Sequence, residues 1–78
     1  MICAEVSLYP LKTNEASSAI TQSIDSLHNY GVEYSVGSMS THLEGNEKQV
    51  WESLQGMFRK AQESGEISMV ITITNAAH

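Results

Sequence analysis

Residues 31–45 read GVEYSVGSMSTHLEG, and this stretch decides the fold. Apolar and polar residues alternate through it, which is typical of strands with one buried face. Gly37 and Ser38 interrupt the alternation and predict a turn, so we expect a β-hairpin whose polar residues gather at positions 38–44. The hairpin residues that are expected to face the core side of the sheet are Val32, Tyr34, Val36, Met39, Thr41 and Leu43.

A helical pattern precedes this hairpin. Ile20, Ile24 and Leu27 recur at helical spacing and form one narrow apolar stripe. Thr13 or Asn14 is suited to cap the start of the helix. Gly31 follows the stripe, where a glycine in the left-handed region commonly ends a helix.

A second helical pattern follows the hairpin. Asn46 is a good N-cap, and Gln49 stands three residues later, as in a capping box. The apolar stripe of this helix is expected to pack in the core. Core packing is also the favoured interpretation of Trp51. Its members are Val50, Leu54, Met57 and Ala61, widened by Trp51 and Phe58.

Strand patterns stand at both ends of the chain. Residues 2–9 and 67–74 alternate with period two, and Pro10 is expected to end the first strand. The order is therefore βαββαβ, which predicts an α+β, ferredoxin-like fold with a four-stranded antiparallel sheet and both helices on one face. The remaining core-facing positions are Ile2, Ala4, Val6, Leu8, Ile67, Met69, Ile71 and Ile73. The opposite face is expected to carry Glu5, Ser7, Ser35, Ser40, His42, Val70, Thr72 and Thr74.

Length and charge limit the classes of function. Seventy-eight residues predict one domain, residues 1–78, with a small core that favours self-association. A net charge of −5 with four dispersed bases argues against nucleic acid and anionic membranes as partners. No apolar run or signal-like start is present, and the one cysteine, Cys3, excludes an internal disulfide, so we expect a cytoplasmic protein.

The sequence contains no positive sign of catalysis, metal or cofactor. Cys3 has no neighbouring base, and Ser17 and Ser18 lack a nucleophile elbow. The three histidines show no metal-ligand spacing, and the glycines form no phosphate-binding loop. We therefore expect no enzyme activity and no catalytic or metal-binding residues.

The polar hairpin strand is the best candidate for a binding site. Thr41 should point toward the helices, where its hydroxyl needs a hydrogen-bond partner. A ligand contact and a purely structural role, in which Thr41 bonds a local carbonyl or merely suits a strand, are equally good explanations. Tyr34 could pack in the core while its hydroxyl reaches the rim of a pocket. Glu44 could bind a cation or an amino group, or be a solvated acid near a helix N-terminus.

The quoted hairpin resembles that of the small thiamine-binding proteins, in which Gly-x-x-Tyr precedes a short turn and then Met-x-Thr-x-hydrophobic-Glu-Gly. The opening MICAEVSLYPL is also similar, and the resemblance extends from residue 1 to about residue 74. It implies a ferredoxin-like fold, homodimers or homotetramers, and binding of thiamine or its hydroxymethylpyrimidine part without catalysis. The matching residues are Tyr34, Met39, Thr41, Leu43, Glu44 and Gly45.

The chemistry of a pyrimidine is compatible with this resemblance. Its ring nitrogens accept hydrogen bonds and its amino group donates them, and serine and threonine hydroxyls do both. The expected ligand-binding residues are Tyr34, Ser38, Ser40, Thr41 and Glu44, the last facing the positive thiazolium of thiamine. Two alternatives stay open: an assembly module that associates through its sheet face and binds no small molecule, and a small ferredoxin-like enzyme.

Overall fold

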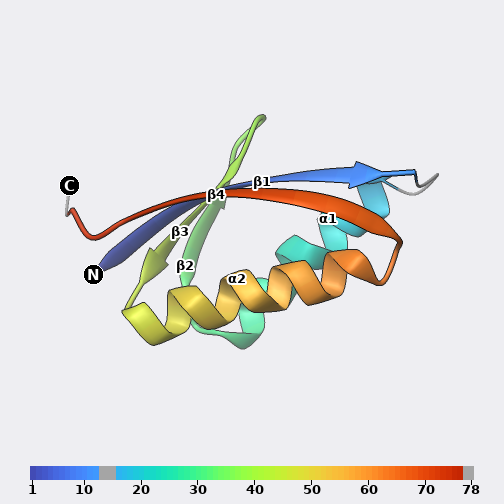
Figure 1. Cartoon of the computed structure of the whole chain (residues 1–78). Coiled ribbons are helices and arrows are strands. Elements are labelled where there is room, and N and C mark those ends of the chain that lie inside the picture. The colour runs from blue at the N-terminus through green and yellow to red at the C-terminus, as the bar shows by residue number, and fades with distance from the viewer. Residues whose placement is uncertain (13–15, 77–78) are drawn as a thin grey trace.

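The described residues form a four-stranded antiparallel sheet with helices on one face (Figure 1). The structure is a computed structural model that describes residues 1–12 and 16–76. The strands are β1 (Ile2–Leu11), β2 (Glu33–Val36), β3 (Thr41–Gly45) and β4 (Glu66–Thr74), in the order β2-β3-β1-β4 across the sheet. The helices are α1 (Ala16–Asp25), the short 3₁₀ helix η1 (Ser26–Asn29) and α2 (Glu47–Gln62). The predicted ferredoxin-like fold is confirmed.

β1 is paired along nearly its whole length on one side only. It pairs with β4 from Cys3 to Leu11, but with β3 only from Ile2 to Val6. Beyond the last pair, Val6 with Thr41, the β2–β3 hairpin diverges from β1, and its tip extends on the side of the sheet opposite the helices (Figure 1). The second half of β1 therefore has no strand neighbour on that side.

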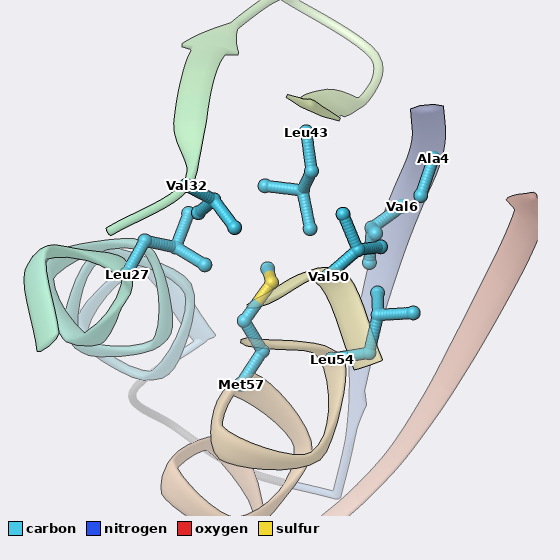
Figure 2. Close-up of a cluster of buried hydrophobic side chains, with 8 residues drawn as sticks. All are labelled: Ala4, Val6, Leu27, Val32, Leu43, Val50, Leu54 and Met57. Atoms are coloured by element: carbon cyan, nitrogen blue, oxygen red, sulfur yellow. The ribbon is translucent and has the colours of Figure 1, made fainter. Parts of the chain in front are cut away.

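The core lies between the sheet and α2. Figure 2 shows the side chains of Leu43, Val50 and Met57 converging there, and each is 0 % exposed. The alternation in the strands and the stripe of α2 predict these positions correctly, because both periodicities select one buried face. The full buried cluster is Ala4, Val6, Leu27, Val32, Leu43, Val50, Leu54 and Met57.

Several predicted core positions are wrong. Met39 lies in the hairpin turn and is 84 % exposed, because β3 begins only at Thr41. Trp51 and Phe58 are 48 % and 39 % exposed, since they lie at the border of the α2 stripe where the sheet ends at β4. Val36 and Ile71 face the helix side of the sheet but are also exposed.

Two other expectations need correction. β1 continues through Pro10 to Leu11 rather than ending at the proline. A strand tolerates proline where one side has no hydrogen-bonded neighbour, and β1 has only β4 beside it there. Ser40 precedes β3 and is not part of the sheet face opposite the helices.

The helix ends follow the sequence signals where they are described. Gly31 has φ +73°, as a left-handed residue after a helix should. Asn46 Oδ1 accepts a hydrogen bond from the Gln49 backbone N–H at 2.8 Å, and the Asn46 N–H donates to Gln49 Oε1 at 3.1 Å. The predicted capping box is confirmed, whereas Thr13 and Asn14 lie outside the described residues.

Replacing Asn46 with alanine should lower the free energy of unfolding by about 1 kcal/mol, because the Gln49 backbone N–H at the start of α2 loses its side-chain acceptor. Urea unfolding at fixed protein concentration measures the change. Asn29→Ala, at an exposed position, is the control and should change the stability by less than about 0.5 kcal/mol. Equal stabilities for the two variants would contradict a stabilising role for the capping box.

Candidate functional site

A hollow opens where the hairpin diverges from β1. We call it the hairpin hollow; its volume is about 290 Å³. It is bounded by residues 6–9 of β1, by Ile20 and Ile24 of α1, and by residues 36–41 of the hairpin. It exists because β3 pairs with β1 only as far as Val6. Beyond that pair, no strand of the hairpin covers the side of α1 that carries Ile20 and Ile24.

The hairpin hollow combines an apolar wall with hydroxyl groups. Ile20 and Ile24 are half-buried and present aliphatic surface. No charged side chain lines it among the described residues, which makes a small organic ring a better occupant than an ion or a phosphate. The hydroxyl groups come from Ser7, Tyr9, Ser38, Ser40 and Thr41.

The turn beside the hollow is fixed by two hydrogen bonds. The Gly37 backbone N–H donates to the Ser40 carbonyl at 2.8 Å, which closes the turn. Ser7 Oγ donates to the Met39 carbonyl at 3.2 Å and thereby ties the turn to β1 across the gap. One hydrogen bond within the turn and one between the turn and β1 therefore set the position of the polar hairpin residues relative to β1.

Thr41 is the most enclosed polar residue of the hollow. Its side chain points to the helix side of the sheet, as the alternation predicts, and the residue is 6 % exposed. Among the described residues, no hydrogen bond involves its hydroxyl, and no fully enclosed side-chain oxygen is left unpaired. The Thr41 hydroxyl is thus accessible at the hollow, and its contact with a ligand stays a prediction.

Tyr34 packs against the core cluster from β2. Its ring is half-buried on the helix side, but its hydroxyl lies 3.1 Å from His28 Nε2, and the two rings meet edge to face at 5.7 Å. The hydroxyl therefore has a partner in η1. Tyr34 does not line the hairpin hollow.

Glu44 lies on the face of the sheet away from the helices, which we call the open face. Three positions separate it from Thr41, so the two side chains point to opposite faces. Glu44 accepts a weak hydrogen bond from the thiol of the buried Cys3, at 3.9 Å. It also borders a separate hollow of about 190 Å³, whose other lining residues are Glu33, Tyr34, Ser35 and His42.

The structure thus brings Ser38, Ser40 and Thr41 together in the hairpin hollow, and it brings the other two predicted site residues, Tyr34 and Glu44, together in the separate hollow. Ligand contact by any of the five stays a prediction. Sequence reasoning missed Ser7, Ile20 and Ile24 as lining residues. The available signal was a mismatch in length: the first strand pattern is longer than the hairpin arm that could pair with it.

In residues 1–12 and 16–76, no group of three or more His, Cys, Asp or Glu side chains is arranged to hold a metal ion. In the same part of the chain, no helix is long and apolar enough to span a membrane.

Comparisons with known proteins agree on the fold. Residues 4–77 match a family model described as thiamine-binding protein. No curated protein matches the sequence. The chain is also similar to solved structures at low sequence identity, which shows the shared fold alone; three of them are described next.

The first is a hypothetical protein from Methanocaldococcus jannascii, with 20% identity and a TM-score of 0.85, covering 97% of this chain and 80% of that one. A domain of unknown function from Bacillus cereus has 24% identity and a TM-score of 0.84, with coverages of 96% and 75%. A Thermotoga maritima protein, described as a candidate for thiamine biosynthesis or salvage, has 16% identity and a TM-score of 0.81, with coverages of 96% and 83%.

Proposed function

This chain belongs to the thiamine-binding protein family, and from that membership we propose that it binds thiamine or its hydroxymethylpyrimidine part without transforming it. The observation that supports the proposal is the meeting of Ser38, Ser40 and Thr41 in the hairpin hollow, opposite an aliphatic wall. A flat, uncharged ring with hydrogen-bonding atoms on its edge is complementary to such a site.

The pyrimidine ring lies against Ile20 and Ile24 in this proposal. Its ring nitrogens accept hydrogen bonds from hydroxyl groups, and its amino group donates one. The volume of about 290 Å³ is near the lower limit for ligand pockets, which suits one ring rather than both rings of thiamine. The positive thiazolium would then stay outside the hollow, in solvent.

The lining also supports binding rather than catalysis. General acid–base catalysis near neutral pH usually employs a histidine, a carboxylate or a lysine within hydrogen-bond distance of the substrate. The described lining offers aliphatic and hydroxyl groups instead. We further propose a cytoplasmic location, because Cys3 is a free thiol.

Replacing Thr41 with valine should weaken binding of hydroxymethylpyrimidine and thiamine about 5- to 100-fold, because an isosteric methyl group replaces a buried hydroxyl and leaves a polar ligand atom unpaired. Isothermal titration calorimetry with each ligand measures the change. Thr72→Val is the matched control, since Thr72 is exposed on β4 and is not part of the hairpin hollow.

Wild-type affinity in Thr41→Val would contradict the placement of the ligand in the hairpin hollow. No heat with either ligand at millimolar concentration would contradict the proposed function itself.

A further inference from the structure

The main chain of β1 borders the hairpin hollow at residues 7–9. Beyond the pair of Val6 with Thr41, β1 keeps β4 on one side and has no strand on the other. In an antiparallel sheet, successive residues of a strand direct their backbone N–H and C=O groups alternately to the two sides. Some of these groups therefore point into the hollow, with no strand there to pair with them.

Pro10 identifies the residue that carries these groups. It has no N–H, yet it stands opposite Ile67 inside the ladder between β1 and β4. A proline is tolerated in a strand when its nitrogen points away from the neighbouring strand. The backbone groups of Pro10, and by alternation those of Leu8 and Val6, therefore point away from β4 and toward the hairpin. At Val6 they meet Thr41, and at Leu8 they meet the hollow.

The hairpin turn leads to the same assignment. The Gly37 N–H donates to the Ser40 carbonyl at 2.8 Å, so the main chain of Ser40 faces β2. The next residue, Thr41, therefore directs its N–H and C=O to β1, where Val6 is its partner. Among the described residues, no backbone hydrogen bond joins the turn to Leu8 across the gap. The N–H and C=O of Leu8 are thus a donor and an acceptor, side by side, that face the hollow.

We propose that the backbone N–H and C=O of Leu8 bind the edge of the aminopyrimidine ring, which takes the place that the next residue of a longer β3 would fill. This inference rests on the proposed function. The Leu8 N–H donates to the ring nitrogen beside the amino group, and the amino group donates to the Leu8 carbonyl. The ring therefore extends the ladder between β1 and β3 by one pair, and its second nitrogen remains for a hydroxyl group of the hollow.

The surroundings of Leu8 suit this occupant. The residue is half-buried, and backbone groups in such a position gain from a partner that replaces water. Ile20 and Ile24 supply aliphatic surface for the face of the ring, and the Thr41 hydroxyl lies at the last pair of the ladder. The order of donor and acceptor also determines specificity. A pyrimidine with an oxo group in place of the amino group presents N–H and C=O in the reverse order, so it cannot make both bonds in the same pose.

The first test of this contact is calorimetric titration of the wild-type protein with thiamine and two analogues. Oxythiamine carries the oxo group on its pyrimidine, whereas pyrithiamine keeps the aminopyrimidine and changes only the second ring. We expect oxythiamine to bind about 10- to 100-fold more weakly than thiamine, because two hydrogen bonds are lost and the groups of Leu8 stay unpaired. Pyrithiamine is the control and should bind within about three-fold of thiamine, since the second ring stays in solvent.

The second test is amide hydrogen exchange of the ¹⁵N-labelled protein, followed by NMR with and without thiamine. The Leu8 N–H should exchange at least about 10-fold more slowly with thiamine at 100 times its Kd, because the ring then occupies it. Tyr34 is the matched control, because the same alternation turns its N–H to the outer edge of β2, where exchange should not change.

The outcomes separate this inference from the proposed function. Equal affinities for thiamine and oxythiamine, or unchanged exchange at Leu8 in protein that binds thiamine, would overturn the contact with Leu8 and leave the proposed function standing. Absence of thiamine binding would overturn the proposed function, and this contact with it.

Discussion

Replacing Ile20 with arginine is expected to weaken the binding of hydroxymethylpyrimidine about 100-fold, the largest effect on function predicted for this chain. Ile20 lines the hairpin hollow, but it does not pack against the buried core cluster, so the change acts on the hollow more than on the fold. An arginine there occupies the space of the ring and introduces a charge into an apolar wall, which is costly to desolvate. It also repels the thiazolium of thiamine.

The measurement is calorimetric titration of both ligands, with Thr21→Arg as the control. Thr21 is exposed on the same helix and does not line the hollow, so the control carries the same added charge on α1. We expect the control to bind within about two-fold of the wild type, as isolated surface charges have small effects. Equal affinities for the two arginine variants would show that the ligand binds elsewhere.

Replacing Leu43 with alanine is expected to cost about 2–5 kcal/mol of stability, the largest effect on the fold. Leu43 is 0 % exposed and stands in the middle of β3, where its side chain meets those of Val50 and Met57 (Figure 2). The loss includes the transfer free energy of the removed carbons and the cavity that they leave. A domain of 78 residues has a thin core, so a loss of this size should leave much of the protein unfolded at 37 °C.

Urea unfolding followed by circular dichroism measures this change. Leu11→Ala is the control, because Leu11 is 45 % exposed at the end of β1 and should change the stability by less than about 0.5 kcal/mol. Both proteins are compared at one concentration, because the stability of any protein that self-associates depends on its concentration. A loss below about 1 kcal/mol for Leu43→Ala would show that β3 does not close the core.

The sequence predicts the order of the elements because each signal is local. Alternation with period two and stripes at helical spacing describe how a segment presents one face, whatever its neighbours are. Asn46 with Gln49 and the left-handed Gly31 mark boundaries through bonds and angles within a few residues. The same parity also assigns Thr41 and Glu44 to opposite faces of the sheet, although both were expected at one site.

The exposure of particular side chains does not follow from the same signals. Trp51 and Phe58 border the apolar stripe of α2, and periodicity gives the direction of a side chain but not the width of the sheet beneath it. Met39 alternates correctly with Thr41, yet it belongs to the turn, because the ladder between β2 and β3 closes at Val36 and Thr41. These outcomes depend on where neighbouring strands end.

The sequence by itself therefore determined the ferredoxin-like order, the buried faces of the strands and the polar residues of the hairpin. The tertiary structure alone decided that Ser38, Ser40 and Thr41 meet Ile20 and Ile24 across a gap, because the extent of pairing between β1 and β3 is set by contacts between segments distant in the chain. It also decided which edge of the sheet stays uncovered, since an edge is defined only once all four strands have taken their places.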